Sequence, residues 1–562
     1  MFSRREFMQV TAATAAIMGA QTPLGALAAS QKISQNDLLD FESKGNVTLL
    51  HLTDIHAQLV PVYFREPSVN LGVGNVHGLV PHITGREFLT HYNIPRNSLD
   101  AYALTYLDFA EMASAYGRVG GIDRMATVVN AVRAQRPNNT LLLDGGDTWQ
   151  GSYTSYQTKG MDMVKAMNKL GCDAMTAHWE FTYGTERVEE LVENLNFPFL
   201  VGNVRDTEWD EPVFEAIQYF ERGGVKIAVI GQAFPYTPVA NPRHFIPNWS
   251  FGIREEEVAK NVEKARSSGA ELVVLVSHNG FDTDRKLASR VKGIDVLLSG
   301  HTHDAVPEAL PVGKTLLIAS GSHGKFLSRL DLDVRNGEVK DYSFRLIPIL
   351  SDVIAPDREM TKLVREIRAP FQDVISEKLA TTESTLYRRG NFNGTFDDLI
   401  CDALLEQRDA EIALSPGFRW GASLLPGQPI TVDDVHNMTS ITYPAAYRNK
   451  MSGQMLKDVL EDVADNLFNE DPYYQQGGDM VRVGGMGYAI NPNKPFGQRI
   501  TNMQLLSTGS PIEASKDYTV AGWASVNEGT EGPAIWDVVC DYLRAKKSVN
   551  VQPRDQVKLV GT

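Results

Sequence analysis

Seven histidine and aspartate side chains stand directly after short apolar runs of this sequence, or in the turn that follows one. Five of the 12 histidines fall in only four such motifs: Asp-x-His, Thr-Ala-His-Trp-Glu, Ser-His and Gly-His-Thr-His. Imidazole nitrogens and carboxylate oxygens together form a ligand set that suits divalent first-row metals. The candidate ligands are Asp54, His56, Asp147, His178, His278, His301 and His303.

Each of these residues could also have an ordinary structural role. A single Asp-x-His at a strand end is more often a turn cap than a ligand, and a single histidine in a glycine turn is usually structural. Their concentration in a few motifs favours one shared site. Gly145 and Gly146, which precede Asp147, also let the backbone approach other groups closely. We therefore predict a dinuclear metal site.

The elements that must position these residues alternate between strand and helix patterns. Residues 46–53 (NVTLLHLT) and 140–143 (TLLL) read as buried strands, and apolar residues recur on one helical face between 122 and 132. Such alternation predicts a layered α/β architecture. The carboxyl ends of its strands meet at one edge, so the candidate ligands should converge there. Further predicted strands cover 225–230, 272–276 and 296–298, and further helices 161–170 and 186–194.

The chain divides into several regions. We predict a metallohydrolase domain over 45–350, a helical connector over 351–385 and a substrate-binding domain over 386–562. Residues 60–116 are rich in Pro, Gly, Asn and aromatics without a clean period. A long irregular insertion in a compact domain is usually functional. Because it follows the Asp54/His56 pair, we expect it beside the mouth of the site.

The first 28 residues resemble an export signal. Arg4-Arg5 precedes Phe7 and an Ala-rich apolar run that ends in Ala26-Leu27-Ala28, as in a twin-arginine signal peptide. This predicts a periplasmic protein, and no later apolar run suggests a membrane span. The net charge of −15 argues against nucleic acid as a partner. We expect a monomer, with its three cysteines as structural thiols.

The order of these motifs resembles the calcineurin-like metallophosphoesterases, and more narrowly their 5′-nucleotidase branch. The resemblance implies an α/β metallophosphoesterase domain followed by a 5′-nucleotidase-like α/β domain. It also implies two divalent ions, with Mn²⁺ preferred and Zn²⁺ or Fe as alternatives. By that resemblance Asp147 bridges the two ions. The other ligands divide into Asp54, His56 and His303 for one ion and His178, His278 and His301 for the other.

Two positions bear on the reaction. Where the nucleotidases read Gly-Asn-His-Glu-Phe, this chain reads Ala-His-Trp-Glu-Phe, so Trp179 occupies the position of their catalytic histidine. Indole cannot donate a proton as imidazolium does. Arg419, in a segment similar to the nucleotidase Gly-Gly-Ile-Arg, is a candidate anchor for a substrate anion.

The tryptophan, the insertion and the leader together resemble the thiosulfohydrolases of the periplasmic sulfur-oxidation (Sox) system. This resemblance implies release of sulfate from a cysteine S-thiosulfonate on a SoxYZ-like carrier protein that presents a C-terminal cysteine. The alternative is a periplasmic 5′-nucleotidase or cyclic-nucleotide phosphodiesterase. A third possibility is a non-catalytic module that binds an anion or the carrier, against which the retained ligand positions argue.

Overall fold

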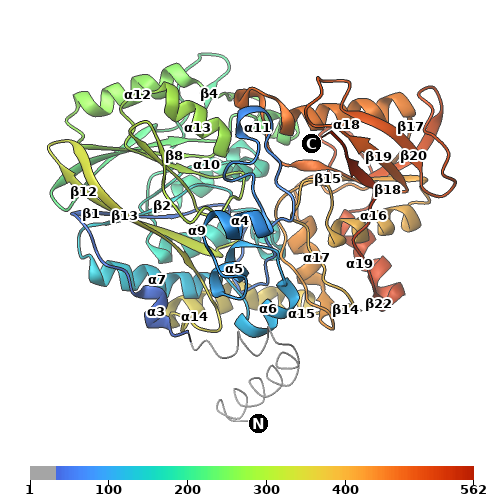
Figure 1. Cartoon of the computed structure of the whole chain (residues 1–562), viewed down its shortest axis with the longest axis horizontal. Helices are drawn as coiled ribbons and strands as arrows, with labels where there is room; N and C mark the ends of the chain where they lie inside the picture. Colours follow the sequence, from blue (N-terminus) through green and yellow to red (C-terminus); the bar gives the residue numbers. More distant parts are fainter. Residues whose placement is uncertain (1–32, 562) are drawn as a thin grey trace, which may run out of the picture.

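The computed structural model describes residues 33–561 (Figure 1). The predicted export signal, residues 1–28, lies outside the described residues. Two regions lie side by side, an N-terminal one up to about residue 350 and a C-terminal one. Among residues 33–561, no helix is both long enough and apolar enough to cross a membrane.

The N-terminal region is built on two sheets. In spatial order, the first contains β13 (Glu338–Pro348), β12 (Phe326–Arg335), β1 (Val47–Leu52), β2 (Thr140–Asp144) and β3 (Ala174–Met175). The second contains β10 (Leu310–Val312), β11 (Thr315–Ala319), β9 (Val296–Ser299), β8 (Leu272–Ser277), β6 (Val225–Gln232) and β5 (Ile217–Arg222). The pairs β1–β2, β6–β8 and β8–β9 are parallel. Their carboxyl ends therefore deliver the loops that follow them to one edge.

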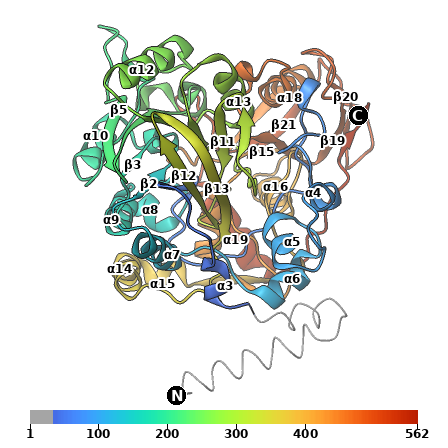
Figure 2. The same cartoon turned by 60° about the vertical axis from the view of Figure 1, so that its left-hand side comes forward.

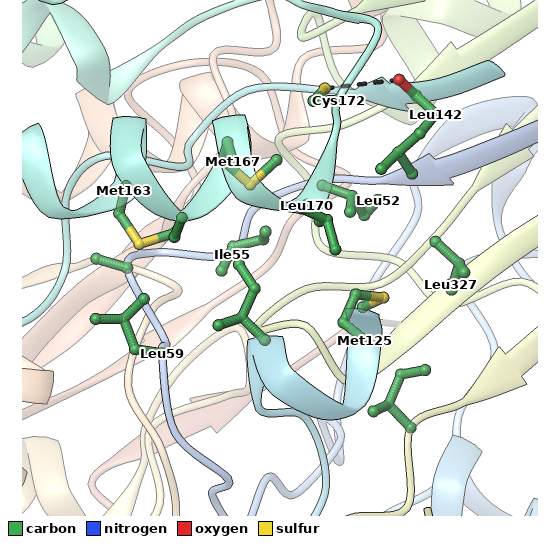
Figure 3. Close-up of a cluster of buried hydrophobic side chains, with 14 of the residues drawn as sticks. Leu52, Ile55, Leu59, Met125, Leu142, Met163, Met167, Leu170, Cys172 and Leu327 are labelled. Atoms are coloured by element: carbon green, nitrogen blue, oxygen red, sulfur yellow. Dashed lines mark hydrogen bonds between the residues drawn. The ribbon is translucent and has the colours of Figure 1, made fainter. Parts of the chain in front are cut away.

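Strand β1 shows how the two sheets form layers. Its side chains alternate between faces, as in any strand. Val47 and Leu49 pack in a core with Val274 and Val276 of β8, so the sheets face each other. Leu50 and Leu52 instead join the opposite core, against helices α7 (Ile122–Gln135) and α9 (Met161–Leu170). Figure 3 shows Leu52 in one cluster with Met125, Met163 and Met167.

Helices also cover the outer face of the second sheet. Ile230 and Leu275 of that sheet pack with Val262 of α12 (Glu255–Ser267) and Leu287 of α13 (Phe281–Arg290). The order is therefore helix, sheet, sheet, helix. The layered α/β architecture predicted from the strand–helix alternation is confirmed.

The insertion over 60–116 is not structureless. It contains the short helices α4 (Gly85–His91), α5 (Leu99–Leu104) and α6 (Phe109–Tyr116), each too short to give a clear helical period. In Figures 1 and 2 these helices, drawn in blue, lie next to the C-terminal region. Two contacts fix this placement: Tyr63 forms a β-bridge with Ser423, and the Arg65 guanidinium lies 4.0 Å from the centroid of the Tyr387 ring.

The predicted connector begins as a helix and ends as a strand. Helix α14 (Arg358–Arg368) buries Met360 and Val364 in the core that α7 and α9 share. A short turn and α15 (Gln372–Ile375) follow, and then β14 (Lys378–Thr382) pairs with strands of the C-terminal region. The end of the connector therefore belongs structurally to the second region.

The C-terminal region contains three small sheets, β17-β21-β15-β18, β20-β19-β23 and β16-β14-β22. Its strands are β15 (Ile412–Gly417), β16 (Pro429–Thr431), β17 (Tyr447–Ser452), β18 (Asp479–Gly484), β19 (Met486–Ile490), β20 (Ile500–Leu505), β21 (Asp517–Gly522), β22 (Ser548–Val549) and β23 (Val557–Leu559). Its main helices are α16 (Thr395–Gln407), α17 (Val432–Thr439), α18 (Gly453–Phe468) and α19 (Ile535–Lys546). The loop after β15 and the loop before β18 face the N-terminal region and complete the site described next.

Candidate metal centre

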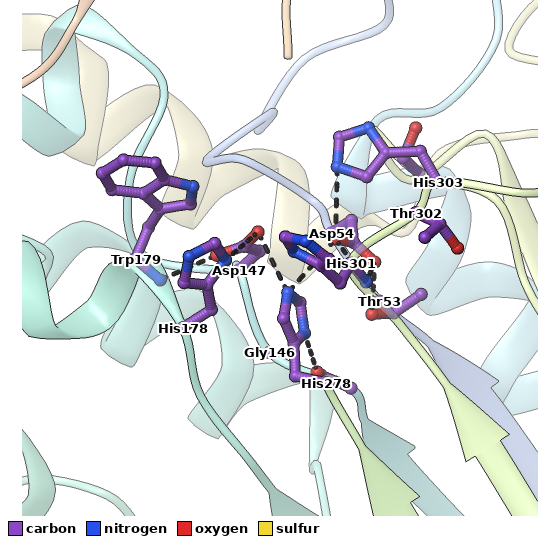
Figure 4. A network of polar contacts seen from close by, with 12 residues as sticks. Thr53, Asp54, Gly146, Asp147, His178, Trp179, His278, His301, Thr302 and His303 are labelled. Carbon is purple, nitrogen blue, oxygen red and sulfur yellow. Dashed lines mark hydrogen bonds and ion pairs between the residues drawn. The ribbon is translucent and has the colours of Figure 1, made fainter. Parts of the chain in front are cut away.

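The structure brings all seven predicted ligands together at the carboxyl edge of the two N-terminal sheets, and all seven are buried. Figure 4 labels each of them except His56. They form two groups, each with ligand atoms within 4.8 Å of one another. Asp147 belongs to both groups. The first group is completed by Asp54, His56 and His303, and the second by His178, His278 and His301.

The distances within the groups are typical of ligands that share a cation. The Nε2 atoms of His56 and His303 lie 3.0 Å apart. Asp147 Oδ2 lies 3.2 Å from His178 Nδ1 and 3.1 Å from His278 Nε2. Five buried imidazoles and two carboxylates at such separations would repel or compete for protons, unless a cation accepts their lone pairs. The donor set and its geometry therefore fit two divalent ions.

Backbone strain marks the loops that carry these ligands. Five of the seven ligands have a positive φ, which non-glycine residues rarely adopt outside functional sites. They are Asp54 (52°), His56 (49°), Asp147 (57°), His301 (76°) and His303 (59°). Hydrogen bonds between loops hold this conformation: Asp54 N donates to the Gly146 carbonyl and His56 N to the Asp147 carbonyl, both at 2.8 Å.

Burial keeps most of the histidines neutral, as metal ligands must be. It lowers the pKa of His56 to about 4 and holds the pKa values of His301 and His303 well below their usual range. For His278, burial again favours the neutral form, but Asp147 and Asp54 outweigh it and raise its pKa to about 10. In the protein without metal, His278 therefore holds a proton that a cation must displace.

Glu180 connects the ligand loops, although its own role was not foreseen from the sequence. Its buried carboxylate accepts hydrogen bonds from the backbone N–H groups of Thr148 at 2.6 Å, His178 at 2.7 Å and Trp149 at 3.2 Å. It therefore fixes the loop of Asp147 against the loop of His178. The only sequence signal was its place two residues after His178.

A cavity with an empty volume of about 670 Å³ opens onto both ligand groups. We call it the aromatic cavity, because five aromatic side chains line it: Trp179, Phe234, Tyr236, Phe418 and Trp420. The Trp179 ring meets those of Phe418 and Trp420 edge-on, at centroid distances of 5.5 and 5.2 Å. The C-terminal region thus supplies part of this wall. No hydrophobic periodicity in the sequence indicated this contribution.

The two residues predicted to act on the substrate both line the aromatic cavity. Trp179 is buried next to His178, and its backbone N–H donates to Asp147 Oδ1 at 2.8 Å. The Nε of Arg419 lies 3.4 Å from Asp479 Oδ1, and its Nη1 has no hydrogen-bond partner among the described residues. That N–H group is free to bind an anion in the cavity.

A glycine loop of the C-terminal region closes over one ligand group. The Nε2 of His301 lies 3.0 Å from the Gln476 carbonyl oxygen. A Cβ at Gly477 would lie 2.1 Å from the same Nε2. Only glycine therefore fits at 477, a requirement that the sequence alone did not reveal.

The insertion lies close to the ligands but outside the wall of the aromatic cavity. None of the residues 60–116, all of which the structure describes, lines the aromatic cavity. Residues of the insertion instead line two smaller cavities that reach His301 and His303. The insertion therefore lies beside the ligands, while residues within 234–240 and 417–420 contribute to the wall of the aromatic cavity.

Comparisons with known proteins agree with this geometry. Residues 375–538 match the family model of the 5′-nucleotidase C-terminal domain. The 5′-nucleotidase of Rattus norvegicus is 24% identical over 74% of this chain and 78% of its own length. The snake venom 5′-nucleotidase of Naja atra is 28% identical over 71% and 83%, respectively.

Two solved structures extend the similarity to nearly the whole chain. The Thermus thermophilus sulfate thiohydrolase SoxB, in complex with glycerol, is 36% identical, with a TM-score of 0.89 over 93% of this chain and 98% of its own. A 5′-nucleotidase precursor from Thermus thermophilus is 22% identical, with a TM-score of 0.72 over 92% and 100%, respectively. These levels of identity and coverage, together with the two-region fold, establish the relationship. The chain belongs to the SoxB/5′-nucleotidase branch of the metallophosphoesterases, a family of hydrolases.

Proposed function

We propose that this protein is a metal-dependent thiosulfohydrolase that releases sulfate from a cysteine S-thiosulfonate on a sulfur carrier protein. The reaction is R–S–S–SO₃⁻ + H₂O → R–S–S⁻ + HSO₄⁻ + H⁺, in which R–S is the carrier cysteine. Water adds to the sulfonate sulfur, and the bond between this sulfur and the sulfane sulfur breaks. The electron pair of that bond leaves with the persulfide. The 36% identity to a sulfate thiohydrolase over 93% of the chain supports this substrate class.

The seven grouped residues would hold two divalent ions, for which we propose Mn²⁺. When bound, two such ions supply an activated water and neutralise charge on the substrate oxygens. The protein's part is to keep four of the five imidazoles neutral and to hold Asp147 between the groups. Glu180 performs the second task, through the backbone bonds that join the two loops.

The observation that carries the proposal is the absence of a proton donor from the aromatic cavity, as far as the described residues line it. Every histidine and carboxylate in its wall belongs to the two ligand groups. Trp179 occupies the position that the motif resemblance gives to the catalytic histidine of the nucleotidases. The Tyr236 hydroxyl, whose pKa is raised by burial, donates to the Tyr473 carbonyl. A general acid contributes about 10²–10⁴-fold where the leaving group needs a proton. A persulfide anion needs none, whereas an alkoxide does.

The remaining residues of the wall suit this substrate. The free Nη1 of Arg419 can bind a sulfonate oxygen and stabilise charge as it builds. Trp179 is only 5% exposed, and its ring offers an apolar wall to the sulfane sulfur. The hydrogen bond from its backbone N–H to Asp147 fixes the position of this wall relative to the ligands.

The alternative, a 5′-nucleotidase or cyclic-nucleotide phosphodiesterase, draws on the curated relatives. The aromatic rings of this cavity suit a nucleotide substrate less well than a thiosulfonate. Phe418 and Trp420 stack on each other with centroids 4.0 Å apart, so no nucleobase fits between them. An alkoxide leaving group would also lack an acid.

We also propose that the substrate is delivered by a SoxYZ-like carrier in the periplasm, after export through the twin-arginine pathway. An apolar cavity that reaches buried ligands suits a slender, weakly charged chain end that carries a cysteine.

The test is to load purified protein with Mn²⁺ and supply carrier whose cysteine bears the thiosulfonate. We expect sulfate to appear in proportion to carrier, and none to appear after treatment with a chelator. A carrier variant with serine in place of the cysteine cannot bear the thiosulfonate and serves as the negative control for sulfate release. Rapid hydrolysis of AMP without sulfate release from the carrier would restore the nucleotidase alternative.

A further inference from the structure

Two neighbouring polar cavities adjoin the metal ligands, with empty volumes of about 510 and 370 Å³. Asn70 of the insertion and Asp304 line both of them, and we call the pair the polar chamber. The larger cavity reaches His301, and the smaller reaches His303. The chamber therefore adjoins both ligand groups, and the insertion forms part of its wall.

A thin partition separates the polar chamber from the aromatic cavity. His301, Arg419 and Gly477 line both spaces. Arg419, whose Nη1 lacks a hydrogen-bond partner among the described residues, is part of this partition. An anion bound to Arg419 would therefore have access to either side with only a small displacement.

Arg389 brings a positive charge to the smaller cavity; no described residue forms an ion pair with it, although Asp479, Asp304 and Glu66 stabilise its charge at longer range. Its side chain lines this cavity and is 96% buried, since the residue is only 4% exposed. Its Nε has no hydrogen-bond partner, and its guanidinium forms no ion pair with any described residue. A buried charge without a partner is strongly unfavourable, and such groups persist where a ligand completes them.

Three carboxylates lie near Arg389. Two of them already have cationic partners, and the third, Asp304, accepts a hydrogen bond from Asn70 Nδ2 at 3.0 Å. Glu66, which lines the same cavity, lies 2.7 Å from the ammonium of Lys325. Asp479 lies 3.1 Å from Arg482. Arg389 therefore remains available in the smaller cavity, and a planar guanidinium suits a tetrahedral oxyanion.

The proposed reaction requires a site of this kind. While the carrier tail fills the aromatic cavity, the sulfate formed beside the ligands cannot leave by that route. We infer that the polar chamber is a binding site for the released sulfate, which passes from Arg419 to Arg389 and leaves along the insertion. This inference rests on the proposed function and adds the route of its product.

Direct binding tests the inference without turnover. Crystals of the Mn²⁺-loaded protein soaked in selenate, a heavier analogue of sulfate, should show selenate at Arg389. Arg389→Gln should abolish this density, and Arg389→Lys should retain part of it. Arg365→Gln, on the exposed face of α14, is the matched control and should leave it unchanged. Selenate found only at the metal ligands would overturn the inference.

Steady-state kinetics with the carrier substrate provide a second test of the inference. Added sulfate should inhibit without competing with carrier, and Arg389→Gln should weaken that inhibition by about tenfold or more. It should also lower kcat while leaving the KM for carrier unchanged, with unaltered metal content and thermal unfolding. Sulfate that competes with carrier, equally in both proteins, would contradict the chamber while leaving the proposed function intact. Selenate bound at Arg389 in a protein that does not act on carrier would instead count against the function alone.

Discussion

At the scale of single residues, the site is distinguished by an indole beside a metal-ligand histidine. Trp179 is held in place by its backbone bond to Asp147, so its side chain can change without loss of that contact. Its ring forms part of the cavity wall together with Phe418 and Trp420. The identity of this one side chain therefore bears directly on which leaving group the site accepts.

Replacing Trp179 with histidine should separate the two candidate reactions. We expect sulfate release from the carrier to fall about tenfold, or about 1.4 kcal/mol of transition-state stabilisation, because the apolar wall is lost. Hydrolysis of phosphate monoesters should rise, since an acid becomes available to the alkoxide. Trp179→Phe keeps a wall and should remain close to the native protein. A loss of bound metal in Trp179→His would show that the indole mainly fills the loop.

A buried histidine that is not a predicted metal ligand, His436, predicts sensitivity to acid. Burial lowers the pKa of His436 to about 3 from an ordinary 6.5, so the folded state favours the neutral ring. Its contribution to stability is complete above pH 6.5 and is lost as the pH falls from there toward 3.

The free energy of unfolding should therefore fall by about 1.4 kcal/mol per pH unit in this window from His436 alone. His436→Phe keeps the aromatic packing against Tyr153 and Trp536 without a titrating group. Urea unfolding at pH 6.5 and pH 5 should show a loss smaller by about 2 kcal/mol in this variant. Equal losses in both proteins would contradict the assignment.

At the scale of elements, the sequence predicted the ligands better than the cavity around them. Each ligand follows an apolar run such as that of β8, and the carboxyl ends of parallel strands meet at one edge, so their convergence could be inferred. Phe418, Trp420 and Gly477 lie in loops of the C-terminal region, whose sequences show no helical or strand periodicity. Only the packing of the two regions brings them to the ligands.

Gly477 offers a test of how that loop supports the second ligand group. An alanine Cβ at 477 would lie 2.1 Å from His301 Nε2, so Gly477→Ala should displace this ligand. Elemental analysis should then find about one metal per chain instead of two. Gly478→Ala is the matched control, because Gly478 has a similar φ of 77° but its Cβ would approach nothing closer than 3.6 Å. Equal metal content in the two variants would show that His301 moves aside without losing its ion.

At the scale of the whole molecule, hydrogen bonds fasten the two regions close to the ligands. Asn437 Nδ2 donates to Gln58 Oε1 at 3.0 Å, two residues after His56. The Gly421 N–H donates to His323 Nε2, also at 3.0 Å. These long-range pairs had no signal in the sequence, because they depend on how the two regions pack against each other.

Metal removal should therefore destabilise the entire molecule. Ligand binding to the folded state adds about 4 kcal/mol at a thousandfold excess over the dissociation constant. Calorimetry should show a higher unfolding temperature with Mn²⁺ than after dialysis against a chelator. Asp147→Ala removes the residue common to both ligand groups and should abolish this difference. A variant still stabilised by two metals would show that Asp147 does not bridge them.

The central claim is that water adds to the sulfonate sulfur of a carrier-bound thiosulfonate. The most direct measurement is turnover of the carrier substrate in H₂¹⁸O, with mass analysis of the sulfate and of the carrier. We predict one ¹⁸O atom in each sulfate released and an unlabelled carrier that retains a persulfide on its cysteine. Sulfate without ¹⁸O, or a carrier that loses both sulfur atoms as thiosulfate, would contradict the account.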